Sequence, residues 1–223
     1  MKVAALFSGG KDSAFALWCA QQQGWDVEVL LTLSPKSPES YMFHHPNVEW
    51  TGLQAKAMNI PQLLRKTSGE KEKELEDLRA VMMEAKRRFG ISGIVCGALA
   101  SEYQKERVDF ACEELGLKSF APLWRKNQSA LMREIADNFE VVITSVSAEG
   151  FDESWLGRKI DSECLSDLER LRSRYGVSVS GEGGEYETFT LNAPIFKRRV
   201  RIEKAEKTWG KGTGTYRIIR AVI

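Results

Sequence analysis

Six consecutive residues near the start of the chain have types and spacing suited to binding phosphate. They are Ser8, Gly9, Gly10, Lys11, Asp12 and Ser13, and we call them the phosphate loop. An apolar stretch (3–7) precedes them and a helical pattern follows, so the glycines permit a sharp turn and close approach to a ligand. Amides at a helix start favour an anion, and the lysine and the hydroxyls add donors. The aspartate suits a metal ion or a cationic substrate group.

The phosphate loop differs from two common nucleotide-binding patterns. It lacks the glycine spacing of a Walker A loop, in which Lys and Ser/Thr follow the second glycine. It also lacks the third glycine of a dinucleotide fingerprint. It resembles the PP-loop, SGGxDS, of the N-type ATP pyrophosphatases, which cut ATP between its α and β phosphates and hold the pyrophosphate there. The alternative is a tight strand-to-helix turn that binds nothing.

Two further polar stretches point to the same site. Residues 97–107 (GALASEYQKER) start at the end of a predicted strand and open a helix, so we expect them to face the phosphate loop. Residues 181–187 (GEGGEYE), which we call the acidic loop, hold three carboxylates on a glycine-rich segment. Three acids so close together are costly to gather unless cations hold them. A polar turn with solvated acids is the alternative.

Together these stretches resemble a known family. SGGKDS, then GAxxSEYQxxR running to LGL and PLW, then EGGEYET appear in that order over residues 3–188. This combination is similar to the diphthine–ammonia ligase family of PP-loop proteins. The resemblance implies a HUP-type α/β domain followed by a smaller family-specific domain. It also implies ATP-dependent amidation, with ammonium, of the diphthine carboxylate on translation elongation factor 2, giving diphthamide, AMP and pyrophosphate.

The resemblance and the chemistry of the side chains assign roles to individual residues. The ATP-binding candidates are Ser8, Gly9, Gly10, Lys11, Asp12, Ser13 and Ser34, with Asp12 also a ligand of Mg²⁺. The catalytic candidates are Lys11, Asp12, Tyr103, Gln104, Arg107 and Glu185. The substrate-binding candidates are Tyr103, Gln104, Glu182, Gly183, Gly184, Glu185, Glu187 and Thr188. The acids would bind ammonium, the trimethylammonium group of diphthine or a second Mg²⁺, and Tyr186 and Trp124 are candidates to surround that cation.

Alternating strands and helices in the first half must bring these residues together. Strands are expected at 3–7, 27–33, 62–65 and 93–97, and helices at 13–23, 50–58, 70–89 and 101–115. Gln54 and Lys56 are expected on the surface of their helix. This order predicts a parallel, doubly wound sheet, whose ligands lie beyond the carboxyl ends of the strands. The loops after residues 7, 33 and 97 should therefore meet at one site.

The second half has a different pattern. Helices are expected at 128–137 and 161–175, and strands at 141–143, 188–191, 195–205 and 216–223. We place a boundary near residue 125, giving an ATP-binding domain (1–125) and a C-terminal α+β substrate domain (126–223). The last two strands are expected to form a hairpin through the glycines between them. Nucleic-acid contact at 209–217 is the less favoured interpretation, because aromatic residues are few there.

Composition narrows the class of protein. The chain has 32 Lys+Arg and 31 Asp+Glu, a net charge of +1, which argues against a grip on a nucleic-acid backbone. No apolar run approaches the roughly 18 residues that span a membrane, and the first residues lead straight into a core strand rather than a signal peptide. We therefore expect a cytoplasmic protein without a membrane partner. A homo-oligomer is compatible with everything in the sequence.

Cysteine and histidine residues give weak signals. Cys19, Cys96, Cys112 and Cys164 are scattered, with no CxxC pair, and are expected to be buried free thiols rather than metal or redox groups. His44 and His45 are adjacent on a predicted loop. Neighbouring histidines rarely point the same way, so loop packing or substrate contact is favoured over a metal.

Other functions remain open at this point. One is a PP-loop enzyme that acts on tRNA or on another carboxylate. Such tRNA enzymes commonly carry added RNA-binding domains or catalytic cysteine pairs, and neither is visible in the sequence. The other is a non-catalytic nucleotide-binding module, for which Asp12 and the acidic loop have no clear purpose. The ligase is the favoured reading.

Overall fold

A computed structural model describes residues 1–35, 46–68 and 71–223 of the chain. His44 and His45 lie outside the described residues, so their predicted role stays a prediction. Among the described residues, none of the helices is both long and apolar enough to cross a membrane. The four cysteines are free thiols, three of them buried and Cys19 half-buried, as predicted.

The first half builds a five-stranded sheet with all strands parallel. The strands are β1 (Lys2–Leu6), β2 (Asp26–Pro35), β3 (Gln62–Thr67), β4 (Gly93–Val95) and β5 (Lys118–Phe120), in the order β3-β2-β1-β4-β5. Apolar residues run almost without interruption through β1 and β2, because both faces of a parallel sheet are covered by helices. The order reverses direction at β1, and this is where a doubly wound sheet binds ligands.

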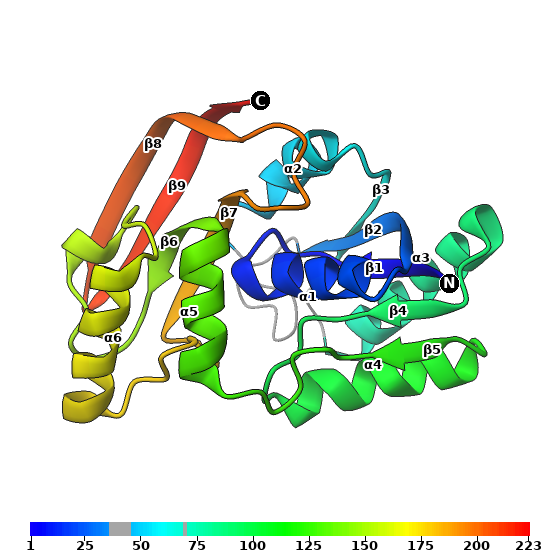
Figure 1. Cartoon of the computed structure of the whole chain (residues 1–223), viewed down its shortest axis with the longest axis horizontal. Helices are drawn as coiled ribbons and strands as arrows, with labels where there is room; N and C mark the ends of the chain where they lie inside the picture. The colour runs from blue at the N-terminus through cyan, green and yellow to red at the C-terminus, as the bar shows by residue number, and fades with distance from the viewer. Residues whose placement is uncertain (36–45, 69–70) are drawn as a thin grey trace.

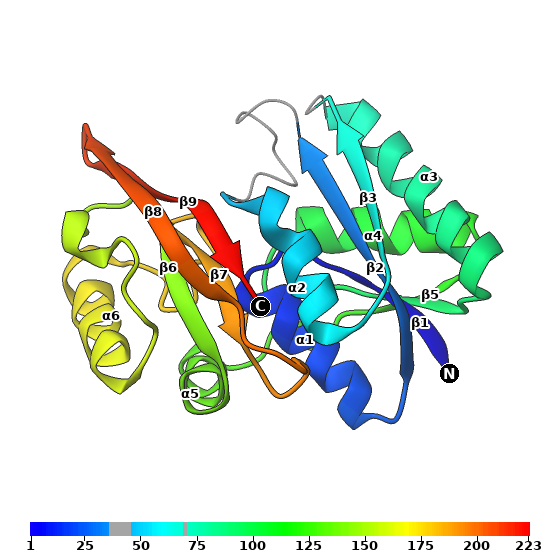
Figure 2. The same cartoon turned by 90° about the horizontal axis from the view of Figure 1, so that it is seen from above.

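Helices cover both faces of this sheet. They are α1 (Lys11–Gln22), a short 3-10 turn η1 (Val48–Trp50) leading into α2 (Thr51–Met58), α3 (Lys71–Phe89) and α4 (Glu102–Glu114). In β1, Val3 and Ala5 pack in one apolar cluster with α1 and α2, whereas Ala4 packs with α3 and α4 in another. Alternate residues of a strand point to opposite faces, so α1 lies on one side and α3 on the other (Figure 2).

The second half forms a four-stranded antiparallel sheet. Its strands are β6 (Glu140–Val146), β7 (Tyr186–Asn192), β8 (Arg201–Gly210) and β9 (Thr213–Val222), in the order β7-β6-β9-β8. Two helices and a 3-10 turn accompany it: α5 (Gln128–Asn138), η2 (Glu153–Trp155) and α6 (Ser162–Tyr175). Asn127 and Asp161 cap α5 and α6 by accepting hydrogen bonds from backbone amides of the first turn.

The two halves share an apolar core. One cluster of buried residues runs from β1 and α1 through α5 and β6 to Tyr186. The rings of Phe15, Trp18 and Phe139 meet where α1 lies against the start of β6, with centroids 5.2–5.6 Å apart. Figure 1 shows α1 between the parallel sheet and the antiparallel half. The predicted α/β class, a HUP-type parallel sheet with a smaller C-terminal α+β part, is confirmed; the boundary near residue 125 remains a prediction.

Two expectations about local structure are wrong. The strand predicted at 195–205 starts at Arg201, because the residues before it turn across the end of α2, where the amide of Lys197 donates to the carbonyl of Ala57 at 2.8 Å. Gln54 is fully buried rather than on the helix surface, whereas Lys56 is exposed as predicted. A helix of eight residues gave too short a pattern to tell its buried face from its exposed face.

Candidate active site

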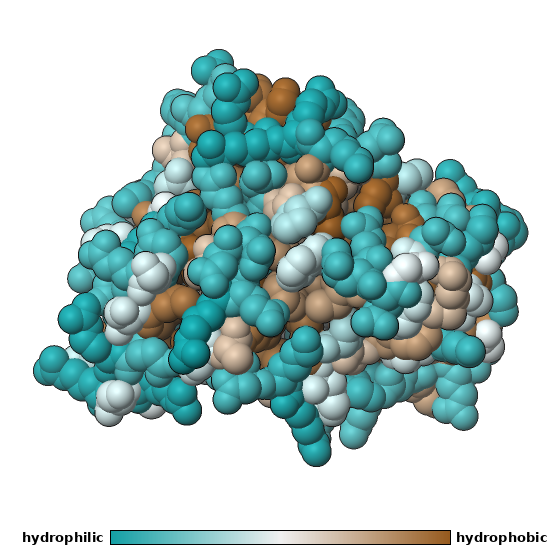
Figure 3. Space-filling model, in the orientation of Figure 1, coloured by the Kyte–Doolittle hydropathy of each residue, from teal (hydrophilic) through white to brown (hydrophobic). Residues whose placement is uncertain are grey.

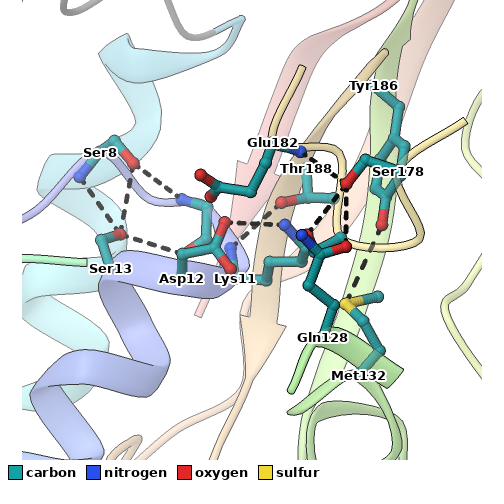
Figure 4. Close-up of polar contacts among 12 residues, drawn as sticks. Ser8, Lys11, Asp12, Ser13, Gln128, Met132, Ser178, Glu182, Tyr186 and Thr188 are labelled. Atoms are coloured by element: carbon teal, nitrogen blue, oxygen red, sulfur yellow. Dashed lines mark hydrogen bonds and ion pairs between the residues drawn. The ribbon is translucent and has the colours of Figure 1, made fainter. Parts of the chain in front are cut away.

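The phosphate loop joins β1 to α1 as the sequence predicts. Helix α1 begins at Lys11, and Gly9 has a φ of +87°, a conformation that favours glycine. Ser13 Oγ accepts from the amide of Ser8 at 3.3 Å and donates to the carbonyl of Gly10 at 3.0 Å. These bonds hold the turn closed (Figure 4). The first amides of a helix have no acceptor within the helix, which makes a helix start suited to binding an anion.

Residues far along the chain fasten this loop. The amide of Thr190 donates to the carbonyl of Gly9 at 2.9 Å, and the amide of Lys11 donates to Thr188 Oγ1 at 3.1 Å. Gln54 Nε2 donates to two carbonyls, that of Gly9 at 3.0 Å and that of Thr190 at 2.7 Å. The phosphate loop is therefore attached to strand β7, which continues directly from the acidic loop.

The segment after β4 also presses against the start of α1. A Cβ placed on Gly97 would lie 2.8–2.9 Å from backbone atoms of Asp12 and Ser13, which a real side chain essentially never does. Glycine is therefore required at 97 for the two loops to meet. Ser101 accepts from the amide of Gln104 at 3.3 Å and starts α4.

Lys11 and Asp12 form an ion pair inside the site. Lys11 is 3% exposed, and its Nζ lies 2.7 Å from Asp12 Oδ2 and 5.4 Å from the centroid of the Tyr186 ring. Burial, then the charge of Asp12, raises the pKa of Tyr186, whose hydroxyl donates to the carbonyl of Val179 at 2.6 Å. Lys11 thus has its charge balanced by a carboxylate and a ring face before any ligand arrives.

The acidic loop is held mainly by contacts within its own segment. The two oxygens of the Glu185 carboxylate accept from the amides of Ser178 and Gly183, each at 2.8 Å. Ser178 Oγ accepts from the amide of Glu182, and Ser147 Oγ donates to the carbonyl of Gly184. Glu185 was expected to face the cleft after its flexible glycine pair, but its carboxylate instead closes the loop on itself.

Glu182 is the acid that reaches the neighbouring loop. Its Oε2 accepts from the amide of Ala100 at 3.0 Å. Figure 4 shows its side chain extending from the acidic loop toward the phosphate loop. Burial first, and then the charge of Asp12, raises the pKa of Glu182. Two carboxylates from opposite ends of the sequence are therefore close enough to repel each other, and a cation between them would relieve that repulsion.

These loops line one cavity of about 680 Å³. The expected residues on its wall are Ser8, Gly10, Lys11, Asp12, Ser13, Gln104, Glu182, Gly183, Gly184, Glu187 and Thr188, with Tyr186 beside them. The expected residues that do not line it, within the described residues, are Gly9, Ser34, Tyr103, Arg107, Glu185 and Trp124. Leu31 and Leu33 of β2 and Cys96, Gly97 and Ala98 after β4 contribute an apolar side.

Three of the candidate residues that do not line the cavity lie near it. Ser34 is half-buried at the end of β2, past the lining residue Leu33. On α4, the guanidinium of Arg107 lies 3.3 Å from the centroid of the Tyr103 ring and donates to the Tyr103 carbonyl. The two residues of this stack flank Gln104, which does line the cavity: Tyr103 precedes it by one residue and Arg107 follows it by three. Tyr103 and Arg107 therefore border the site rather than form its wall.

Comparison with known proteins decides the family. The chain matches the diphthamide synthase N-terminal domain over residues 1–119 and the diphthamide synthase C-terminal domain over residues 127–223. It is 37% identical to the diphthine–ammonia ligase of Rattus norvegicus, covering 92% of this chain and 84% of that protein. The Homo sapiens protein of the same name is 36% identical with the same coverage. The chain belongs to the diphthine–ammonia ligase family.

More distant matches extend over a similar part of the chain. The diphthine–ammonia ligase of Schizosaccharomyces pombe is 31% identical over 92% of this chain, which corresponds to 37% of that longer protein. Among solved structures, a predicted subunit of tRNA methyltransferase from Methanocaldococcus jannaschii aligns with 87% of this chain and 98% of its own, at 14% identity and a TM-score of 0.44.

A magnesium ion fits the residues that this family member presents. Asp12 Oδ1 is buried without a hydrogen-bond partner among the described residues. Glu182 is a second carboxylate near Asp12, since the charge of Asp12 raises its pKa. Among the described residues there is no cluster of three or more metal-ligating side chains. Mg²⁺ is commonly bound by one or two carboxylates together with substrate phosphates rather than by a full protein cage. The donor set therefore suits magnesium that arrives with a nucleotide.

Sequence reasoning missed several residues that position the site. The side chains of Gln54, Ser178 and Ser147 act through hydrogen bonds to backbone groups of the two loops. A polar residue between apolar positions, as in Leu53-Gln54-Ala55, is the one signal that could have marked Gln54 as buried. Ser147 and Ser178 lie in loops with no distinguishing pattern, and their partners are set by the tertiary fold.

Proposed function

We propose that the protein is an ATP-dependent amide ligase that converts the diphthine carboxylate of elongation factor 2 to an amide, with ammonium as the nitrogen source. The products would be diphthamide, AMP and pyrophosphate. One observation carries the proposal: in a member of this family, a pyrophosphate-type loop and an acidic loop line the same cavity. The first suits the leaving group of ATP, and the second suits a cationic reactant.

The reaction needs activation because a carboxylate has a poor leaving group. A carboxylate oxygen attacks the α-phosphorus of ATP, the bond to the β-phosphate oxygen breaks, and pyrophosphate leaves. The nitrogen of ammonia then attacks the acyl carbon, AMP leaves with the former carboxylate oxygen, and the nitrogen loses a proton. The protein contributes positioning and stabilisation of charge.

The phosphate loop supports the first step. Its amides and the hydroxyls of Ser8 and Ser13 are donors on the cavity wall, at the positive end of the α1 dipole. Lys11, held by Asp12, supplies a fixed positive charge on that wall. When bound at Asp12 and Glu182, Mg²⁺ would neutralise part of the phosphate charge. Leu31 and Leu33 provide an apolar surface for the nucleoside.

The acidic loop supports the second step. Glu182, together with Glu187 on the same wall, gives the cavity a negatively charged side. Ammonium or the trimethylammonium group of diphthine is attracted to such a side. A bound ammonium must lose a proton before it can attack, and a carboxylate of the acidic loop on the cavity wall would accept it. Gln104, on the wall at the start of α4, is a donor for the acyl oxygen.

The same cavity and charges bear on the cellular compartment and on the alternative functions. We propose a cytoplasmic enzyme, since elongation factor 2 acts in that compartment. An RNA-directed PP-loop enzyme is less well supported, because the net charge is +1 and the cavity wall carries carboxylates. A non-catalytic module gives no reason for Asp12 and Glu182 to line the same cavity.

The proposal is tested by product analysis. The protein is incubated with ATP, Mg²⁺ and ammonium, with or without elongation factor 2 that carries diphthine. AMP and pyrophosphate should form in step with the amide and depend on the protein substrate. Omission of ammonium should stop amide formation. ADP and phosphate appearing in step with the amide would contradict the assignment of the phosphate loop.

A further inference from the structure

The C-terminal part of the chain has a strongly positive net charge, whereas the rest of the chain is net negative. Residues 197–223 contain nine Lys or Arg and two Asp or Glu, a formal charge of +7 in a chain of net charge +1. The preceding 196 residues therefore carry −6. The nine basic side chains are all exposed. The charge of this segment is thus concentrated on the β8–β9 hairpin and the turn that leads into it.

Few of these charges are neutralised within the protein. Among the described residues, Arg199 pairs with Glu140, Lys204 with Glu206 at 3.9 Å, and Arg220 with Glu203 at 2.7 Å. The other six basic residues have no ion pair there: Lys197, Arg198, Arg201, Lys207, Lys211 and Arg217. The hairpin therefore presents an unbalanced positive field to solvent.

Two basic residues of the hairpin lie opposite each other, and each is also paired with a glutamate of β8. Lys204 lies directly opposite Arg220 across the two strands. Like charges in such a pair destabilise a hairpin, by up to about 1 kcal/mol. An acidic partner bound at this face would offset that repulsion.

The hairpin is fixed on its inner side and open on its outer side. The side chain of Asn47 bonds to the carbonyl of Tyr216 at 3.0 Å and to the amide of Ile218 at 2.7 Å, and Trp50 Nε1 donates to the carbonyl of Ile218 at 3.0 Å. Strand β8 is the edge of its sheet. Figure 3 shows hydrophilic residues over most of this upper part of the molecule.

The hairpin is also continuous with the wall of the cavity. Ser145 lines the cavity, and its hydroxyl donates to the carbonyl of Gly214 at 3.1 Å, near the hairpin turn. Strand β9 pairs with β6 at this point. Trp209 and Ile219, each 38% exposed, add apolar contact area among the charges. A large molecule that inserts one side chain into the cavity could therefore rest on the hairpin at the same time.

We propose that the β8–β9 hairpin is the docking surface for an acidic patch on the protein that carries the carboxylate substrate. The inference rests on the proposed function, because a substrate attached to a protein needs a surface beyond the cavity. A protein is favoured over RNA, because Glu203 and Glu206 interrupt the basic residues and Trp209 is the one tryptophan on the hairpin.

The test compares two sets of substitutions with the same change in charge. The hairpin variant is Lys204→Glu, Lys207→Glu and Arg217→Gln, in which Glu at 204 lies opposite Arg220 and favours the fold. The control variant is Arg87→Glu, Lys118→Glu and Arg133→Gln, whose residues are exposed and have no ion pair among the described residues. A milder hairpin variant, Lys204→Gln, Lys207→Gln and Arg217→Gln, guards against misfolding. Thermal unfolding and ATP binding verify each fold.

The readout is the steady-state KM for the diphthine-bearing protein. The hairpin variant should raise this KM about tenfold or more and weaken its salt dependence, with KM for ATP unchanged. The milder variant should give a smaller rise, and the control variant should match the wild type. An unchanged KM in the hairpin variants overturns the docking surface while the proposed function stands. If the wild type forms no amide, the proposed function fails and the docking surface falls with it.

Two further measurements would reveal whether RNA or a second copy of the chain, rather than the protein substrate, binds the hairpin. Binding of a fluorescent RNA oligonucleotide that the hairpin variant abolishes, with KM for the protein unchanged, would make the hairpin an RNA surface. Sedimentation that shows a wild-type dimer, dissociated by the same variant, would make it a contact between two copies of the chain. Either result overturns the proposal.

Discussion

The phosphate loop and the acidic loop line the same cavity, yet different contacts hold them. Gln54, Thr188 and Thr190, which lie 40 or more residues away in the sequence, bond to the backbone of the phosphate loop. In the acidic loop, the carboxylate of Glu185 bonds to amides two and seven residues away. The first loop is closed by its own serines and also fastened by distant residues, whereas the carboxylate of Glu185 fastens the second mainly to its own segment.

In each loop, the residues that face the cavity differ from the residues that hold the loop in shape. In the phosphate loop the charged residues lie at the cavity, and the supporting residues come from elsewhere. In the acidic loop one acid, Glu182, reaches toward the phosphate loop, and another, Glu185, supports the turn. Residues of the same type and neighbouring positions can therefore have different roles.

The largest effect is expected from the ion pair of the phosphate loop. Asp12→Asn and Lys11→Met should each lower the rate of adenylation by about 10²–10³, because each removes a charge from the cavity wall. Each should also reduce stability, since the remaining partner is left in a mostly buried site without its counter-charge. The double variant should be more stable than the sum of the single effects predicts. Additive losses in stability would show that the pair is not coupled.

A smaller effect is expected from the support of the phosphate loop. Gln54→Met keeps the volume but removes both donors to the Gly9 and Thr190 carbonyls. The free energy of unfolding should fall by roughly 1–3 kcal/mol, and KM for ATP should rise about tenfold. Lys56→Met, at an exposed position of the same helix, is the control. An unchanged KM for ATP would mean that the loop keeps its shape without this bond.

Glu185→Gln distinguishes support from direct contact in the acidic loop. An amide side chain has one acceptor oxygen, so one of the two backbone amides loses its partner. Stability should fall by about 1 kcal/mol, and hydrogen exchange at Gly183 and Ser178 should accelerate. Glu149→Gln, an exposed acid outside the loop, should leave both unchanged. Loss of amidation with unchanged exchange would instead place Glu185 in contact with the substrate.

The smallest effect is a pH-dependent gain in stability. Because burial and Asp12 raise the pKa of Glu182, the folded protein binds this proton more tightly than the unfolded chain. That contribution to stability is complete below the usual pKa of glutamate and is lost as pH rises through the raised value. Glu182→Gln should therefore unfold at a higher temperature than the wild type above that range and at the same temperature below it. Equal melting at all pH values would contradict the raised pKa.

Part of this site could be predicted from the sequence, because local patterns determine it. Strand–loop–helix contexts and glycine spacing are features of short stretches of sequence. From them we could predict the phosphate loop, the parallel sheet and the common site of the two loops. Alternating strands and helices placed the ends of β1 and β4 at one edge. Residue types with a clear chemical purpose, such as Lys11 and Glu182, were therefore found.

The remainder depends on contacts that no local pattern encodes. Gln54 is predicted on the helix surface because its side chain is polar. The hydrogen bonds that keep it buried go to residues 45 and 136 positions away, which no local pattern shows. Glu185 was expected at the cleft because a carboxylate after two glycines has the same local pattern whether it binds a ligand or its own backbone. No local pattern shows that Lys11 is buried against Asp12 and Tyr186, because Tyr186 comes from the other half of the chain.

In the proposed mechanism the two loops serve one reaction, which proceeds through an acyl-adenylate. The most direct measurement is a single turnover with the substrate carboxylate labelled with ¹⁸O, followed by mass spectrometry of the nucleotide product. Attack of the carboxylate on the α-phosphorus predicts one labelled oxygen in AMP for each amide formed. Unlabelled AMP, or label in inorganic phosphate with ADP as the nucleotide product, would contradict this account.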